Sequence, residues 1–208
     1  MGEIHSKVRA YYSAAVERWG PTPQGVDWQS AAAQYLRFVQ LLKICSFDTA
    51  FSLNDFGCGC GALLDYLALR HDSATIAYRG IDLSFAMIEA ATKRWAKRRD
   101  TTFVVGSTCN GVADYSLASG VFNVRLGEPI DEWEAYVESI LADLRVSSRI
   151  GFAVNFKLPL DNGPMEDNLY RTRQERWMTL CRKRLGCEVE TLVGYGLREF
   201  TLLASVQT

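Results

Sequence analysis

The spacing of apolar residues along the chain switches repeatedly between two patterns, and this switching predicts strands that alternate with helices. Short apolar runs, typical of strands inside a sheet, lie at 51–56, 75–82, 101–106, 116–124 and 150–156. Apolar residues three and four positions apart, the pattern of a helix that buries one face, lie at 62–70, 84–97, 169–185 and in a segment that begins at Asp131. We therefore expect five strand-then-helix units.

Two helix starts carry signals of their own. Ser30 is placed to cap a helix that runs to about Ile44, and Asp131 together with Glu134 matches a capping box. The helix that Ser30 would cap lies before the first predicted strand. Residues 1–46 are therefore expected to form a helical segment ahead of the strand-helix alternation.

The end of the chain departs from this alternation. The apolar runs 189–193 and 200–206 are separated only by 194–199, which is too short for a crossover helix. Such a pair predicts an antiparallel hairpin, whereas the preceding strands, with their crossovers, predict parallel pairing. We expect an α/β fold with a seven-stranded, mostly parallel sheet, helices on both faces and an antiparallel strand at the sheet's end. Without internal repeats or linkers, 1–208 is expected to be a single domain.

Composition narrows the class of protein. The chain has 208 residues, of which 48% are hydrophobic and 23% charged, as in ordinary globular domains. Its formal net charge of −1 argues against a nucleic-acid partner, because a domain that neutralises many phosphates is usually strongly basic. No apolar run approaches the roughly 20 residues that span a bilayer, and no signal peptide is visible. Six cysteines suggest no disulfide framework, so we expect a cytoplasmic protein without a membrane partner.

The stretch Gly57-Cys58-Gly59-Cys60-Gly61, directly after the first predicted strand, is the main candidate for chemistry. Its cysteines lack the two-residue gap of zinc sites, and no second pair accompanies them, so no metal is expected. No Gly-Lys-Ser/Thr follows, which excludes a phosphate-binding P-loop. Gly57-x-Gly59-x-x-Ala62, with Asp82 ending the next strand, does match a nicotinamide-cofactor loop. That interpretation stays open at this point.

Further residues around the loop favour a different cofactor. Asp55 stands two positions before Gly57, and Gly61 extends the motif to Asp-x-Gly-x-Gly-x-Gly. Together with the strand-helix order and the C-terminal hairpin, this motif resembles the class I S-adenosylmethionine-dependent methyltransferases over essentially the whole chain. The resemblance implies a Rossmann-like sheet, S-adenosyl-L-methionine as cofactor, and an N-terminal segment 1–46 that forms a lid over a core at 47–208.

Four segments outside the loop carry a closer likeness. They are Gly20-Pro21-Thr22-Pro23-Gln24-Gly25-Val26-Asp27-Trp28, Leu36-Arg37-Phe38, Ala118-Ser119-Gly120-Val121-Phe122-Asn123-Val124 and Tyr195-Gly196-x-x-Glu199-Phe200-Thr201. They are similar to a bacterial subgroup of small stand-alone methyltransferases. The subgroup indicates the class of enzyme and does not identify the acceptor.

The resemblance implies roles for residues around the loop. Gly57, Gly59 and Gly61 would let the backbone approach the cofactor, because they lack Cβ atoms. Asp55 would position this loop or the cofactor's amino group. Asp82 would accept both ribose hydroxyls, although as a carboxylate near a helix start it could also serve the helix dipole. Residues expected to contact the rest of the cofactor are Leu83 and Met87 at the adenine, Ser107 in place of the family's acidic residue, and Ser119 with Gly120 near the methyl group.

Other candidates rest on weaker patterns. Arg37 lies on a helix face among apolar residues and would suit the methionyl carboxylate with its bidentate fork, or it is a surface arginine. Tyr11, Tyr12 and Trp28 lie in the expected lid and Phe122 near the methyl group; these are candidate substrate contacts, or members of the packed core.

The expected reaction is an in-line displacement in which alignment and exclusion of water supply much of the catalysis. No catalytic base is assigned, because His5 is close to the terminus and His71 ends a helix on the wrong side of the sheet. The partner is expected to be a small-molecule acceptor. A nicotinamide-dependent oxidoreductase and a non-catalytic methyltransferase-like binding module are the alternative functions. The sequence indicates neither the methylated atom nor the oligomeric state.

Overall fold

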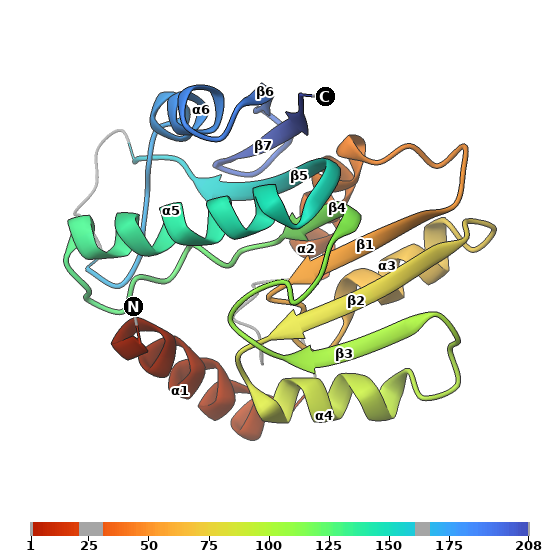
Figure 1. Ribbon diagram of the computed structural model, residues 1–208. Coiled ribbons are helices and arrows are strands. Elements are labelled where there is room, and N and C mark those ends of the chain that lie inside the picture. Colours follow the sequence, from red (N-terminus) through yellow and green to blue (C-terminus); the bar gives the residue numbers. More distant parts are fainter. Residues whose placement is uncertain (1, 21–30, 161–166, 208) are drawn as a thin grey trace.

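The computed structural model describes residues 2–20, 31–160 and 167–207, and in this part of the chain one seven-stranded sheet forms the centre (Figure 1). The strand order is β3-β2-β1-β4-β5-β7-β6. The strands are β1 (Phe51–Phe56), β2 (Ile76–Asp82), β3 (Thr101–Val105), β4 (Ala113–Ala118), β5 (Ser148–Lys157), β6 (Cys187–Leu192) and β7 (Glu199–Val206). The expected seven-stranded, mostly parallel sheet is confirmed.

The C-terminal hairpin adds one detail to this expectation. β1 to β5 pair in parallel, whereas β7 is antiparallel to both of its neighbours, β5 and β6. The antiparallel strand therefore lies second from the edge, because β7 inserts between β5 and β6. Insertion pairs β7 along both sides and leaves β6 at the edge.

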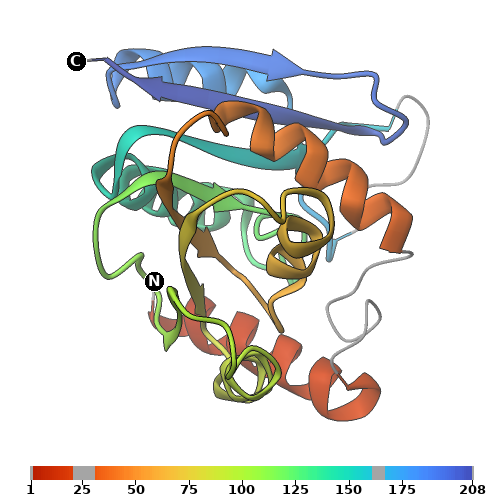
Figure 2. The ribbon, with the colours of Figure 1, turned by 90° about the vertical axis from the view of Figure 1, so that its right-hand side faces the viewer.

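Helices cover both faces of the sheet. They are α1 (Gly2–Trp19), α2 (Ala31–Leu41), which continues into the short 3-10 helix η2 (Leu42–Ile44), α3 (Ala62–Arg70), α4 (Phe85–Arg94), α5 (Ile130–Val146) and α6 (Gln174–Lys183). In Figure 1, α5 lies in front of the sheet, and α2 and α3 lie behind it. α1 packs beside α4 at the β3 end of the sheet (Figure 2).

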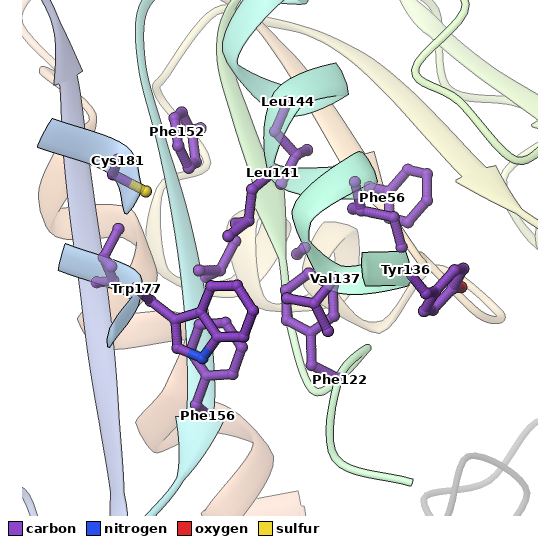
Figure 3. Packing of buried hydrophobic residues seen from close by; sticks show 14 of the residues in the cluster. Phe56, Phe122, Tyr136, Val137, Leu141, Leu144, Phe152, Phe156, Trp177 and Cys181 are labelled. Atoms are coloured by element: carbon purple, nitrogen blue, oxygen red, sulfur yellow. The ribbon is translucent and has the colours of Figure 1, made fainter. Parts of the chain in front are cut away.

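Each face has its own hydrophobic core. Behind the sheet, Phe38 and Leu41 of α2 and Leu64 of α3 pack on inward-facing residues of the central strands. In front, the largest cluster joins α5 and α6 to β5 and β7. In this cluster Phe156 stacks on Phe122 at 5.0 Å and on Trp177 at 5.4 Å between ring centroids (Figure 3). These two cores hold the carboxyl ends of the parallel strands in place.

Two expectations about the middle of the chain were wrong. The described structure has four strand-then-helix units rather than five, because β3 and β4 are joined by the non-helical segment 106–112. The apolar run 116–124 was assigned to a strand, but β4 ends at Ala118 and the remaining residues form a buried turn segment. Local apolarity alone does not distinguish a buried strand from a buried turn.

Two helix starts also differ from the prediction. α5 begins after Pro129, and no side chain caps it. The oxygens of Glu134 instead bind the Tyr170 hydroxyl (2.8 Å) and Arg176 (2.5 Å), so tertiary contacts replace the expected capping box. α6 begins only at Gln174, because Leu169 and Arg171 form isolated bridges to other segments. Ser30, the other expected cap, lies outside the described residues.

Candidate functional site

A pocket of about 650 Å³, open to solvent, lies at the carboxyl ends of β1, β2 and β4. Ligand sites in open α/β sheets are found at this edge, beyond the ends of the strands. The predicted site residues that line it are Tyr12, Gly57, Gly59, Asp82, Leu83, Met87, Ser119 and Gly120. Residues far apart in the sequence thus meet at one edge, as the strand order requires.

The glycine loop is held against β2 by backbone hydrogen bonds. The amides of Gly57 and Cys58 both donate to the Ile81 carbonyl, at 2.7 and 3.0 Å. Gly57 has φ +74°, and a Cβ built there would lie 2.5 Å from Cγ2 of Val121. Glycine is needed at this position both for the left-handed backbone and for contact with the turn after β4.

At Gly61, packing and backbone conformation require glycine, and the pocket does not. This residue has φ +84°, and a Cβ there would lie 2.9 Å from Nε1 of Trp95, the residue that follows α4. Gly61 is not among the residues that line the pocket. The third glycine of the motif therefore serves the packing at the start of α3, where a side chain would collide with Trp95.

Asp82 connects the loop to the next helix. Its Oδ2 accepts from the Gly59 amide and its Oδ1 from the Ser84 amide, both at 2.9 Å. Burial raises the pKa of Asp82, and these backbone hydrogen bonds oppose the shift. A carboxylate has about four lone-pair sites, so Asp82, which lines the pocket, can still accept hydrogen bonds from a ligand.

Asp55 lies beneath the loop and not in the pocket wall. It is 2% exposed, and the Tyr78 hydroxyl donates to its Oδ2. The pKa of Asp55 is raised to about 7: burial is the largest cause, the Tyr78 hydrogen bond lowers it, and the negative charge of Asp82 raises it. A carboxyl in this position supports the loop from below and is partly protonated near neutral pH.

The cysteines of the loop are buried and carry no reactive signature. The Cys58 thiol lies 3.5 Å from the Gly59 carbonyl, and the Cys60 sulfur lies 3.9 Å from that of Met87. Burial raises the pKa of both thiols, that of Cys60 to about 11. Thiols of this kind remain protonated at neutral pH and pack as small side chains.

Besides Asp55 and Gly61, four predicted site residues lie away from the pocket wall. Arg37 forms an ion pair with Glu199, so its guanidinium is already occupied by a carboxylate of this chain. Phe122 has no exposed surface and belongs to the core in front of the sheet. Ser107 is half-buried in the turn after β3, and Tyr11 is exposed with its ring edge-on to Tyr12. Trp28 lies outside the described residues.

The pocket also has walls that the sequence did not predict. Val8 and Arg9 of α1 contribute one side, so α1 closes the pocket over the strand ends. Tyr136 of α5 contributes another (Figure 3). Its side chain is 1% exposed and its ring lies edge-on to His5, at 5.3 Å between centroids. A tyrosine on the buried stripe of a helix was the available signal, since a buried hydroxyl usually needs a partner.

The Tyr136 side chain is buried where it lines the pocket, with 1% of its surface exposed. Burial raises the pKa of Tyr136, so the hydroxyl keeps its proton and can both donate and accept. A hydroxyl at the wall of a pocket is a group that a ligand can bind.

Within 2–20, 31–160 and 167–207, no three His, Cys, Asp or Glu side chains are grouped as metal ligands. None of the helices described here is both long and apolar enough to cross a membrane.

Comparisons with known proteins agree with this geometry. The model of a family described as a methyltransferase domain matches residues 54–140, which include the glycine loop, Asp82 and Tyr136. A protein of Mycobacterium tuberculosis that carries the name of a methyltransferase is 41% identical over 163 residues, which are 78% of this chain and 97% of that protein.

Solved structures share the fold at low sequence identity. The magnesium protoporphyrin IX methyltransferase of Synechocystis PCC 6803, crystallised with S-adenosylhomocysteine, has a TM-score of 0.68 and 16% identity, covering 97% of this chain and 99% of that one. A S-adenosylmethionine-dependent methyltransferase of Aquifex aeolicus has a TM-score of 0.59 and 17% identity, covering 98% of both chains. At such identities the likeness shows the fold alone.

Proposed function

The chain belongs to the methyltransferase family, and from this premise we propose that it transfers the methyl group of S-adenosyl-L-methionine to a small-molecule acceptor. The observation that carries the proposal is the pairing of the glycine loop with Asp82 at the wall of the pocket. The Gly59 amide donates to Asp82 at 2.9 Å, so the loop and the carboxylate form one unit. The pocket wall thus places the exposed backbone of the glycines next to a carboxylate that can accept hydrogen bonds.

The residues present suit this cofactor in three respects. Gly57 and Gly59 leave room for close approach of its methionyl and ribose parts. The free lone pairs of Asp82 suit two ribose hydroxyls. Leu83 and Met87 offer apolar surface to an adenine ring, and the Tyr136 hydroxyl offers a hydrogen bond within the same pocket. When bound, the cofactor supplies a sulfonium methyl group for in-line displacement.

The chain's own contribution to the reaction is alignment and exclusion of water. Ser119 and Gly120 follow β4 and leave small side chains where an acceptor would approach. α1, with Val8 and Tyr12 facing inward, shields the other side of the pocket. Correct placement of two reactants supplies up to about 7–11 kcal/mol of the barrier in favourable cases. No general base is assigned, since none is required for an amine or an acidic hydroxyl.

Calorimetry tests this function directly. We expect S-adenosylhomocysteine to bind to the protein and NAD to release no heat of binding. A panel of small molecules, assayed with S-adenosylmethionine labelled in its methyl group, then identifies the acceptor. Binding of NAD in place of S-adenosylhomocysteine would indicate an oxidoreductase, and binding of neither would indicate a non-catalytic module. Either result would overturn the proposal.

Tyr136→Phe is expected to weaken the binding of S-adenosylhomocysteine about tenfold, because one hydrogen bond from a buried hydroxyl is lost. The ring and its packing stay in place. Tyr170→Phe is the matched control: its hydroxyl is also largely buried but binds Glu134 at 2.8 Å, and Tyr170 is not among the residues that line the pocket. Equal dissociation constants for Tyr136→Phe and the wild type would exclude the hydroxyl as a ligand contact.

We further propose a cytoplasmic location. All six cysteines are free thiols, and five of them are buried. Free thiols persist where the compartment is reducing. Fractionation of the producing cells tests this, and recovery of the protein from an oxidising compartment would contradict it.

A further inference from the structure

A buried polar network connects α2, β5 and β7 behind the pocket. Arg37 donates to both carboxylate oxygens of Glu199, from Nε at 2.7 Å and from Nη2 at 2.5 Å. Nδ2 of Asn155 donates to Oε2 of the same carboxylate at 3.0 Å. The side chains of Arg37 and Glu199 are 7% and 3% exposed, and Asn155 has no exposed surface. The three residues are therefore removed from water together.

The network ends on the pocket wall. Oδ1 of Asn155 accepts a hydrogen bond from the Gly120 amide at 2.7 Å. Gly120 has φ +75° and lines the pocket between Ser119 and Val121. Val121 in turn contacts the loop at Gly57, where a Cβ would come within 2.5 Å of it. The position of Gly120 therefore determines the spacing between the turn after β4 and the glycine loop.

The orientation of Asn155 follows from its two partners. A carboxylate can only accept, so the amide nitrogen must face Glu199, and the amide oxygen then faces Gly120. Glu199 is itself held by the bidentate fork of Arg37. The remaining guanidinium nitrogen of Arg37, Nη1, donates to the Ala33 carbonyl at 3.1 Å. Each member thus determines how the next one is placed.

A gain in folding stability does not explain well why a buried ion pair is present in this network. The desolvation of a buried ion pair offsets most of its Coulomb attraction, so the pair is weak support for a stabilising role. Removal of one partner leaves an uncompensated buried charge. A second cation, Lys157, lies 3.7 Å from Glu199 with a quarter of its side chain exposed. What the network provides is a defined geometry at its Gly120 end.

The network also relates three of the segments that carry the subgroup likeness. These segments are 36–38, 118–124 and 195–201: Arg37 lies on α2, Gly120 in the turn after β4, and Glu199 at the start of β7. Periodicity and spacing gave no reason to connect them. In the structure Asn155 joins them through hydrogen bonds at 2.7 and 3.0 Å.

We propose that Arg37, Glu199 and Asn155 are positioning residues that hold Gly120, and with it the wall formed by 119–121, in the form that receives the acceptor. Arg37 acts through Glu199 and Asn155 and makes no contact with the cofactor. The assignment of 119–121 to the methyl-transfer site rests on the proposed function, but the effect of the network on Gly120 can be measured without any ligand.

The test measures hydrogen exchange of the Gly120 amide by NMR in protein labelled with ¹⁵N-glycine. Arg37→Met and Asn155→Leu are expected to speed exchange at Gly120 at least about tenfold relative to Gly80, a glycine within β2. Asn155→Leu removes the acceptor of the Gly120 amide, and Arg37→Met releases the Glu199 carboxylate that orients this acceptor. Arg37→Lys keeps the charge and is expected to show a smaller effect. Asn54→Leu is the matched control, since Asn54 is also a fully buried strand asparagine that binds the Gly111 carbonyl at 3.0 Å.

Calorimetry on the same variants distinguishes a positioning role of Arg37 from direct contact between Arg37 and the cofactor. If Arg37 is a positioning residue, S-adenosylhomocysteine binds to Arg37→Met within about threefold of the wild-type affinity. A much weaker affinity would mean that Arg37 contacts the cofactor, and the proposal would be wrong. Equal acceleration at Gly120 and Gly80 would indicate general destabilisation and would also overturn it. Failure of the wild type to bind the ligand would refute the proposed function alone.

Discussion

Replacing Asp82 with asparagine is expected to weaken the binding of S-adenosylhomocysteine at least about a hundredfold. The asparagine keeps the shape of the side chain but replaces one oxygen with an N–H donor. That donor must face the amide of Gly59 or of Ser84, each of which donates to Asp82 at 2.9 Å. The ligand also loses a charged acceptor for its ribose hydroxyls. Isothermal titration calorimetry gives the two dissociation constants.

Asp114→Asn is the control for this measurement. The Asp114 carboxylate also accepts from a backbone amide, that of Ser52 at 2.7 Å, but it lies near the amino end of β4, away from the carboxyl ends that form the pocket. We expect its affinity for S-adenosylhomocysteine to equal that of the wild type. If Asp82→Asn bound the ligand within about threefold of the wild type, Asp82 would serve the loop and helix only, and its role as a ligand contact would be refuted.

Asp55→Asn is expected to change the pH dependence of stability. Burial raises the pKa of Asp55 from 3.8 to about 7, so between these values the folded state holds a proton that the unfolded state releases. The contribution of the group to the free energy of unfolding is complete below pH 3.8 and is lost as the pH rises to about 7. Asparagine does not titrate and can still accept from Tyr78. The variant should therefore gain stability relative to the wild type as the pH rises.

The size of this gain is on the order of 2 kcal/mol between about pH 5 and pH 8, since one pKa unit corresponds to about 1.4 kcal/mol. Urea unfolding followed by tryptophan fluorescence measures it. Asp114→Asn again serves as control: hydrogen bonds from Ser52 and the ion pair with Arg149 lower the pKa of Asp114, so the group is ionised in both states over this range. If the difference in the free energy of unfolding between Asp55→Asn and the wild type did not change with pH, the prediction would be contradicted.

Much of the fold follows from local pattern. β1 and α3 have the bounds that periodicity predicted, 51–56 and 62–70, because a buried strand and an amphipathic helix each impose a spacing that is visible in the sequence. The same reasoning failed at 116–124, where apolar residues continue into a buried turn. It also gave no way to know that β7 would insert between β5 and β6, since strand order depends on contacts between distant segments.

The candidate site, like the fold, has a part that the sequence could predict and a part that it could not. The glycine loop and Asp82 end neighbouring parallel strands, so their proximity could be expected from the order of strands and helices alone. Arg37 shows the limit of that reasoning. It was expected to bind the methionyl carboxylate or to lie at the surface, whereas it is buried and paired with Glu199, 162 positions away in the sequence.

The sequence by itself determined the class of the protein: the alternation of strands and helices, the loop at Gly57 and the acidic residue at Asp82 are all set by short-range spacing. The tertiary structure decided which residues complete the site. α1 and Tyr136 became pocket walls, Gly61 became a packing position against Trp95, and Arg37 became part of a network that ends at Gly120. The reason is physical, because backbone periodicity is local, whereas a buried polar group takes whichever partner the packed chain brings to it.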